Sequence, residues 1–261
     1  MFSTDTFVRG AKTPCEDYVL AGTDCLALSD GCSSSRHTDV GARILCHTVM
    51  RTLPREYGIF KREDILSITG VWDAVSELLG LDGTALDATL GIIQVVSDSI
   101  FVRLWGDGVI FYRFFGEKDV RWISVEYEAN MPFYPRYLSR RDLMQYFEKE
   151  NRRHITYSTA GYPQGVLSHF ETSHETLWTR PISQIEFVGI ASDGIRSLKR
   201  PSQDDVVPLE EVLPKLCEFK GTGKRLQRRM NRLLNEYAKQ GVVPYDDISV
   251  GVLFHDRETG A

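Results

Sequence analysis

The 261-residue sequence has no uninterrupted apolar run long enough to span a bilayer, and its first residues, MFSTDTFVRGAK, contain no apolar signal-peptide core. It also has no excess of positive charge, because 31 Lys and Arg residues stand against 36 Asp and Glu residues. The formal charge of −5 argues against a general binder of nucleic acid or of anionic membranes. We therefore expect a cytoplasmic protein with neither nucleic-acid nor membrane partners.

Paired cysteines are also missing. The five cysteines are odd in number and form no Cys-x-x-Cys motif, which argues against a disulfide framework and against a structural zinc site. We interpret them as reduced thiols of a cytosolic protein. They are Cys15, Cys25, Cys32, Cys46 and Cys217.

Internal repeats, low-complexity tracts and Ser/Pro-rich linkers are absent as well. With 42% hydrophobic and 26% charged residues, a chain of this length can bury a sizeable core without disulfide or metal crosslinks. We expect one domain over 1–261, with a surface insertion or flap around 128–175. Within it, the aromatic segment MPFYPRYL is either a substrate-recognition flap or a segment packed on the core.

The hydrophobic periodicity predicts runs of strands interrupted by pairs of helices. Without regular βαβ alternation, such an order indicates an α+β fold with largely antiparallel sheets. Thr38 or Ser35 is the predicted N-cap of the first helix. The predicted helices cover 38–53, 62–81, 209–219 and 224–240, and a short helix is predicted at the end of the stretch 130–153. The predicted hairpin covers 17–29, and the other predicted strands lie within 88–116, 120–127, 154–160, 183–192 and 248–254.

Acidic residues recur where apolar strands begin or end. LALSDG and VGIASDG are two versions of one pattern, an apolar run that stops at Asp-Gly. A turn explains any single Asp-Gly pair, but it does not explain why acids gather at so many strand ends. These acids are Glu16 and Asp17, Asp30, Asp107, Asp193, and the pair Asp246 and Asp247.

Carboxylates that meet in one cleft repel one another, and a divalent cation removes that conflict. Oxygen ligands without a His/Cys set of zinc spacing favour Mg²⁺ or Mn²⁺. Two such ions about 4 Å apart activate water for attack on a phosphoryl group. The residues thus predict a metal-dependent phosphoryl hydrolase, and they leave open whether it is a nuclease, a phosphatase or a cyclase.

Six stretches, in order along nearly the whole chain, resemble the motifs of the type 2C metal-dependent protein phosphatases, in particular the divergent bacterial branch of that family. Each motif alone is weak, and their common order makes the resemblance specific. The stretches are KTPCEDY, LALSDG, DATLGIIQV, LWGDGVIFYR, GIASDGI and DDISVGVLF.

The resemblance implies an αββα sandwich of two mostly antiparallel sheets flanked by helices. It also implies hydrolysis of phosphoserine and phosphothreonine in proteins by a metal-bridging hydroxide, with two Mn²⁺ or Mg²⁺ ions and a third ion as an open alternative. The partner would be a phosphorylated protein, acted on in opposition to a Ser/Thr kinase. By position in the motifs, Asp30 would bridge the two metals, the Gly31 carbonyl would bind one of them, Asp193 and Asp246 would complete the second site, Glu16 and Asp17 would act through metal-bound water, and Asp107 would share a third ion with Asp193.

Two positions depart from the family pattern. Lys12 stands where the family has an arginine that grips the substrate phosphate, and a lysine supplies a point charge without the bidentate fork. Cys32 stands where many members have a histidine proposed as general acid, and we interpret the nearby His37 as a surface residue. Arg9 and Arg36 are the next candidates if Lys12 does not bind phosphate. A pseudophosphatase that binds or senses, and a phosphatase of small molecules or nucleotides, remain alternative functions.

Overall fold

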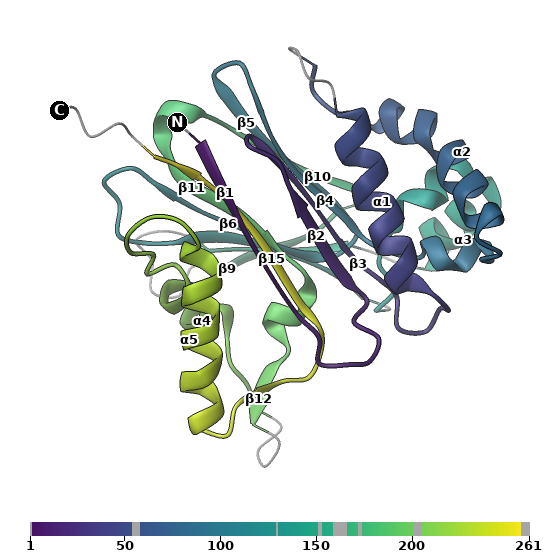
Figure 1. The fold of residues 1–261 in the computed structure, drawn as a ribbon. Coiled ribbons are helices and arrows are strands. Elements are labelled where there is room, and N and C mark those ends of the chain that lie inside the picture. Colours follow the sequence, from purple (N-terminus) through teal and green to yellow (C-terminus); the bar gives the residue numbers. More distant parts are fainter. Residues whose placement is uncertain are drawn as a thin grey trace.

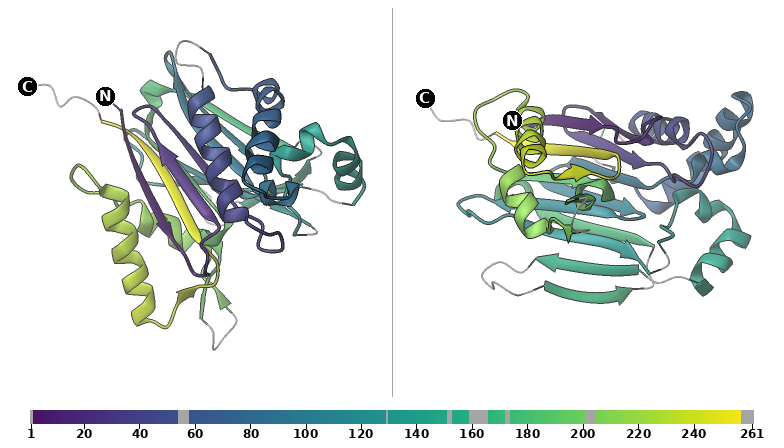
Figure 2. Two further views of the ribbon diagram at one scale, coloured as in Figure 1. Left: turned by 45° about the vertical axis from the view of Figure 1, so that its right-hand side comes forward. Right: turned by 90° about the horizontal axis from the view of Figure 1, so that it is seen from below.

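The computed structural model describes residues 2–53, 58–128, 130–150, 153–158, 166–171, 174–200 and 205–256. Two antiparallel sheets lie face to face between groups of helices (Figures 1 and 2), so the predicted α+β sandwich is confirmed. In spatial order, the seven-stranded sheet contains β1 (Phe2–Arg9), β15 (Ile248–His255), β11 (Ile185–Ala191), β6 (Gly108–Phe114), β7 (Arg121–Tyr127), β8 (Arg153–Ser158) and β9 (Val166–Glu171). The five-stranded sheet contains β10 (Glu175–Pro181), β5 (Ser99–Trp105), β4 (Leu90–Val96), β3 (Cys25–Asp30) and β2 (Asp17–Ala21).

Helices cover the outer faces of both sheets. In Figure 1, α1 and α2 lie on one side of the molecule and α4 and α5 on the other. The helices are α1 (Thr38–Thr52), α2 (Arg62–Leu78), α3 (Arg141–Glu150), α4 (Leu209–Leu216) and α5 (Arg225–Lys239), with short 3₁₀ turns η1 (Gly83–Leu86), η2 (Pro135–Ser139), η3 (Ile182–Gln184) and η4 (Asp193–Arg196). A small third sheet pairs β13 (Asp205–Val206), β12 (Leu198–Arg200) and β14 (Val243–Pro244).

The central strands of the seven-stranded sheet, β6, β11 and β15, are buried on both faces, and their side chains alternate between two apolar clusters. Along β6, Ile110 belongs to the cluster between the two sheets, and Phe111 belongs to the cluster under α4 and α5. Along β15, Leu253 and Val252 divide in the same way. Because successive side chains of a strand point to opposite faces, near-continuous apolar runs are what such a sheet requires.

Helix α1 begins differently from the sequence prediction. Its N-cap is His37, an exposed residue in the left-handed region (φ 61°), so the predicted caps Thr38 and Ser35 are wrong. The Thr38 hydroxyl is used elsewhere, since it contacts Glu16 Oε1 at 3.1 Å and the Cys32 carbonyl at 3.2 Å. This contact ties the start of α1 to the loops of the candidate site.

The segment around 128–175, predicted as a surface insertion, includes residues outside the described ranges. Its described part forms η2, α3, β8, β9 and the start of β10, and β8 and β9 extend the seven-stranded sheet. Phe133, Tyr134 and Tyr137 are buried in the main apolar cluster, so MPFYPRYL packs on the core. The strands β1, β9 and β10 were not predicted from the sequence.

All five cysteines are free thiols, as the sequence predicts. Among the described residues, no helix combines the length and the apolar character that a membrane crossing requires.

Candidate active site

Strand register brings the acid-bearing strand ends to one end of the sandwich. Ala191 at the end of β11 pairs with Val109 of β6 and with Val250 of β15. The turn before β6, the turn after β11 and the approach to β15 therefore lie together. Asp30, the last residue of β3, reaches the same place from the five-stranded sheet. Asp107, Asp193 and Asp246 reach it from the seven-stranded sheet. A cavity of about 240 Å³ there is lined by Asp30, Gly31, Asp107, Asp193 and Asp246, together with Cys32, Ser33, Ser34, Thr89, Asn130, Pro132 and Tyr134.

The two Asp-Gly elements pack too closely for any other residue at the glycine. A Cβ on Gly31 would lie 2.7 Å from the Cβ of Thr38, and a Cβ on Gly194 would lie 1.7 Å from the carbonyl oxygen of Asp247. Each glycine thus allows the loop after its aspartate to lie against a neighbouring site segment. This requirement goes beyond that of a simple turn.

Burial gives the site carboxyls unusual protonation behaviour. Burial raises the pKa of Asp17 to about 7. Hydrogen bonds oppose this rise, and the charge of Asp193 adds to it. Burial and then the Asp193 charge raise the pKa of Asp107 to about 7, against the opposing charge of Arg196. Burial and the charges of Asp17 and Asp193 also raise the pKa of Asp30 well above its usual range. The protein therefore holds several carboxyls where each resists ionisation while the others are charged.

Asp17 lies beneath the cavity rather than on its wall. It pairs with Asp30 across β2 and β3, and its Oδ2 accepts a 2.7 Å hydrogen bond from the Ser192 hydroxyl. Its other oxygen, Oδ1, is buried and has no hydrogen-bond partner among the described residues. A buried carboxylate oxygen without a partner is costly, and a cation is one group that would satisfy it.

The donor set fits a hard divalent cation. The cavity offers carboxylate oxygens, a backbone carbonyl and hydroxyls, the ligand types that Mg²⁺ and Mn²⁺ accept. Within the described ranges, no three His, Cys, Asp or Glu side chains form a ready-made metal cage, so ions would have to draw the carboxylates together. The fit therefore rests on the buried acids and the unpartnered Oδ1 of Asp17.

Thr89 fixes the position of Asp30. The Asp30 N–H donates to the Thr89 hydroxyl at 3.1 Å, and the Thr89 N–H donates to the Asp30 carbonyl at 2.8 Å. The DATLG motif contained this residue, but the sequence alone assigned it no role. It holds the backbone of the candidate bridging aspartate from the neighbouring strand.

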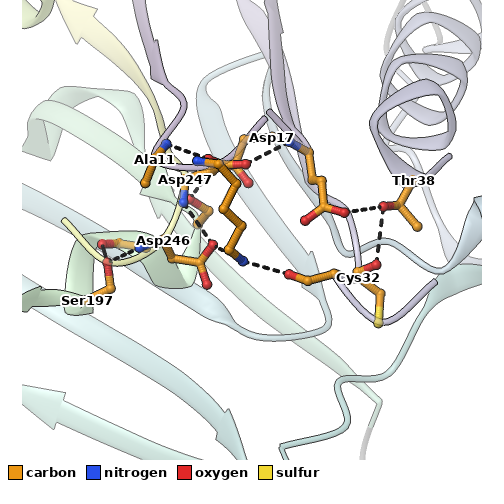
Figure 3. A network of polar contacts seen from close by, with 12 residues as sticks. Ala11, Asp17, Cys32, Thr38, Ser197, Asp246 and Asp247 are labelled. Carbon is orange, nitrogen blue, oxygen red and sulfur yellow. Dashed lines mark hydrogen bonds and ion pairs between the residues drawn. The ribbon is translucent and has the colours of Figure 1, made fainter. Parts of the chain in front are cut away.

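Asp247, to which the sequence analysis assigned no role, organises the N-terminal loop (Figure 3). It is only 2% exposed, and its two oxygens accept backbone N–H bonds from Ala11 at 2.6 Å, Lys12 at 2.9 Å and Glu16 at 2.7 Å. Three such bonds satisfy the carboxylate, so Asp247 acts as a structural anchor. The resemblance singled out Asp246 as a metal ligand, and the anchoring role of Asp247 appears only in the fold.

Lys12 lies at the rim of the cavity. Its Nζ is 2.7 Å from Asp246 Oδ1 and 2.7 Å from the Ser33 hydroxyl, and both partners line the cavity. Burial lowers the pKa of Lys12, but the contact with Asp246 outweighs burial and raises it overall. Arg9 and Arg36 are exposed and are not among the described residues that line the cavity.

Glu16 and Cys32 flank this arrangement. The Glu16 carboxylate accepts the hydroxyl of Thr38 and is not a lining residue of the cavity, whereas Cys32 is. Burial opposes ionisation of Cys32, but hydrogen bonds from Ser34 and Tyr134 outweigh it and lower the pKa of the thiol.

Asp107 has a neighbour that the sequence analysis missed. The Arg196 Nη2 lies 3.6 Å from Asp107 Oδ2, and its Nη1 lies 2.5 Å from Glu126 Oε1. Nothing in GIASDGIRS indicates that this arginine turns towards the β5–β6 loop, because the contact depends on the register of β6 and β11.

A family model described as "Protein phosphatase 2C" matches residues 6–235. The chain belongs to the protein phosphatase 2C family, and it is by class a protein phosphatase, a hydrolase of phosphate esters. The search of curated proteins gave no match.

Solved structures share the fold at low identity. The Mycobacterium tuberculosis serine/threonine phosphatase PstP/Ppp is 14% identical with a TM-score of 0.56, covering 98% of this chain and 99% of that one. Stp1 from Staphylococcus aureus is 14% identical with a TM-score of 0.58, covering 98% and 96%. The PstP catalytic domain in complex with two manganese ions is 15% identical with a TM-score of 0.54, covering 97% of each chain. At such identities the likeness shows the fold, and family membership supports dependence on a metal.

Proposed function

We propose that this chain hydrolyses phosphoserine and phosphothreonine in proteins, with Mn²⁺ or Mg²⁺ held at the acidic cavity. The observation that supports this most directly is the convergence of Asp30, Asp107, Asp193 and Asp246 from separate strand ends onto one cavity. A turn function would not require them to share a cavity. A cation-assisted reaction on an anionic substrate would.

In this proposal Asp30, the Gly31 carbonyl, Asp193 and Asp246 hold two ions. When bound, such ions lower the pKa of water and neutralise the charge of a phosphoryl group. Thr89 keeps Asp30 in place, and Asp17 and Glu16 orient the waters around the ions. The chain thus supplies oxygen ligands from residues that rigid strand ends hold in place.

Lys12 attracts and orients the substrate phosphate in the same proposal. Its ammonium already lies between Asp246 and the Ser33 hydroxyl, so it stands where a phosphate next to the ions would bind. A lysine at this position supplies one charge but lacks the planar guanidinium fork of arginine. Affinity for phosphate should accordingly be lower than with an arginine there.

The pseudophosphatase alternative is favoured by one specific observation, which is the same 2.7 Å contact of Lys12 with Asp246. A lysine bound to a candidate ligand neutralises part of the charge that a metal would neutralise. The burial and the raised pKa values of Asp17, Asp30 and Asp107 favour the enzyme, since the single charge of the half-buried Lys12 leaves most of the acidic charge unbalanced.

The test uses the purified full chain with Mn²⁺ and with Mg²⁺. Phosphate release is measured from an aryl phosphate, from matched phosphoserine, phosphothreonine and phosphotyrosine peptides, and from nucleotides. The proposal expects release from the aryl phosphate and preference for the first two peptides. No release from any substrate would support the pseudophosphatase, and preference for nucleotides would support the small-molecule alternative. Asp193→Ala is the inactive control.

A further inference from the structure

Arg196 contacts Asp107, a residue that lines the candidate active site. It is the last residue of η4, the turn that begins at Asp193. The same short turn therefore carries a candidate metal ligand at its start and a cation at its end. The Nη2 of Arg196 lies 3.6 Å from Asp107 Oδ2, and the side chains of both residues are largely buried, with 19% and 10% exposed.

Two further contacts hold the guanidinium in this position. Its Nη1 lies 2.5 Å from Glu126 Oε1 and 3.2 Å from the Ser124 hydroxyl, and both partners lie on β7. Strand β7 pairs with β6, where the register of Gly108 opposite Val125 places Ser124 and Glu126 beside the Asp107 turn. The arginine is therefore fixed by the sheet, and its position does not depend on Asp107 alone.

We propose that Arg196 is a resident cation at Asp107, and that it replaces the third metal ion that the family resemblance implies for this carboxylate. The active site then holds two ions and one guanidinium. This inference rests on the proposed metal-dependent function and deepens it, because it sets the number of ions that the chain binds.

The physical reason is repulsion between like charges at one buried carboxylate. A divalent ion on Asp107 would lie within a few ångströms of a fixed positive charge, in surroundings where charges are screened less than in bulk water. An arginine keeps its charge at any ordinary pH, so it does not yield its position by deprotonation. The 2.5 Å contact with Glu126 holds the guanidinium beside β7.

The experiment counts bound Mn²⁺ by equilibrium dialysis and by electron paramagnetic resonance of the free ion, with no substrate present. The chains compared are wild type, Arg196→Gln, Arg196→Lys and the double variant Arg196→Gln/Asp107→Asn. Arg200→Gln is the matched control, because Arg200 also contacts an aspartate, Asp205, at 3.6 Å, but on the separate small sheet.

We expect two ions in wild type, in Arg196→Lys and in Arg200→Gln. Arg196→Gln should bind a third ion, with an affinity for it at least about tenfold above any third event in wild type, given the strength of charge interactions at short range. The double variant should return to two ions, because it lacks the carboxylate that holds the third.

Three ions in wild type would overturn the proposal, and this count needs no variant to fold. A folded Arg196→Gln that binds two ions would overturn it as well. Binding of no ion by any chain would contradict the metal-dependent function itself. That result differs from both of the others.

Discussion

Two groups of aspartates in this protein have opposite electrostatic surroundings. The α5 acids, Asp5 and Asp256, lie beside the start of α5. Asp256 Oδ1 accepts a 2.7 Å hydrogen bond from Arg225 Nη1, and Asp5 Oδ2 accepts a 2.7 Å hydrogen bond from the Leu226 N–H. The cavity acids (Asp30, Asp107, Asp193 and Asp246) instead line one cavity together.

The difference appears in the direction of the pKa shifts. For Asp256, burial opposes ionisation, but the hydrogen bonds from Arg225 and Ser3 outweigh it and lower the pKa. For Asp30 and Asp107, burial and neighbouring carboxylates raise the pKa. A protein that favours the ionised form of an acid at one place and disfavours it for several acids at another indicates a function at the second place.

Removal of metal should have the largest effect on activity. It should concern the cavity acids alone, because only they are proposed to bind metal. Excess EDTA is expected to abolish phosphate release, with Mn²⁺ or Mg²⁺ restoring it and Ca²⁺ failing, because the flexible coordination of Ca²⁺ suits water activation poorly. Phosphate release is followed before and after metal is added back. Full activity after thorough chelation would contradict the mechanism.

Substitution of a single acid separates the two groups next. Asp30→Ala or Asp193→Ala should lower kcat by about a thousandfold or more, because each removes a ligand of a water-activating ion. Asp256→Ala should instead lower the melting temperature with little change in kcat, since it breaks a contact with Arg225. Steady-state kinetics and thermal unfolding are measured on all three variants.

Near-wild-type kcat in a well-folded Asp30→Ala or Asp193→Ala would remove that residue from the metal site. A large loss of kcat in Asp256→Ala would show that the two groups are not functionally distinct.

Lys12 should give an intermediate effect. If it orients the substrate phosphate, Lys12→Ala should raise KM for a phosphopeptide about tenfold and lower kcat less, whereas Lys12→Arg should retain or improve activity through its bidentate fork. KM and kcat are determined separately for both variants. Unchanged values in Lys12→Ala would move the search for a phosphate ligand to Arg9 and Arg36.

The comparison also shows which parts of the site can be predicted from the sequence. Asp30 and Asp193 each follow an apolar run and precede a glycine, so local pattern alone finds them. Helices α1, α2, α4 and α5 follow from apolar periodicity, and each lies within three residues of its predicted bounds. What is local in the sequence could be predicted.

What depends on distant pairing could not. Strand β1 has one buried residue, Phe7, and it becomes a strand because it pairs with β15 from Phe2 opposite His255 to Arg9 opposite Ile248. Asp247 and Arg196 have roles only through contacts made across the fold. The roles of the predicted site residues themselves stay predictions until the experiments above are done.

The smallest expected effect is the pH dependence of stability in the metal-free protein. The pKa of Asp17 and that of Asp107 are raised to about 7 in the folded state, from about 4 in an unfolded chain. Between these two values the folded state binds more protons than the unfolded state. The free energy of unfolding must therefore fall as pH rises through this window, and the loss is complete above about pH 7.

The pKa shift of Asp256 has the opposite sign, and its effect on stability falls in another pH range. Because its folded pKa is lowered, its contribution is present above its unfolded value of about 4 and is lost only as pH falls through the lower folded value. Between pH 5.5 and 8 Asp256 should thus contribute no slope. Over the same range Asp17 and Asp107 should lower the melting temperature by several degrees, at about 2–4 °C per kcal/mol for a chain of this size.

Thermal unfolding in EDTA from pH 5.5 to 8 measures this slope in wild type, Asp107→Asn and Asp256→Asn. The comparison between chains matters more than the wild-type curve, because histidines such as His174, whose pKa is lowered by burial, titrate in the same range and cancel in the difference. Asp107→Asn should have a flatter curve and a higher melting temperature at pH 8, since it no longer buries an ionised carboxyl. Asp256→Asn should run parallel to wild type at a lower temperature. If the curve of Asp107→Asn also ran parallel to wild type, the raised pKa of Asp107 would be wrong, and the contrast between the two groups of acids would lose its thermodynamic basis.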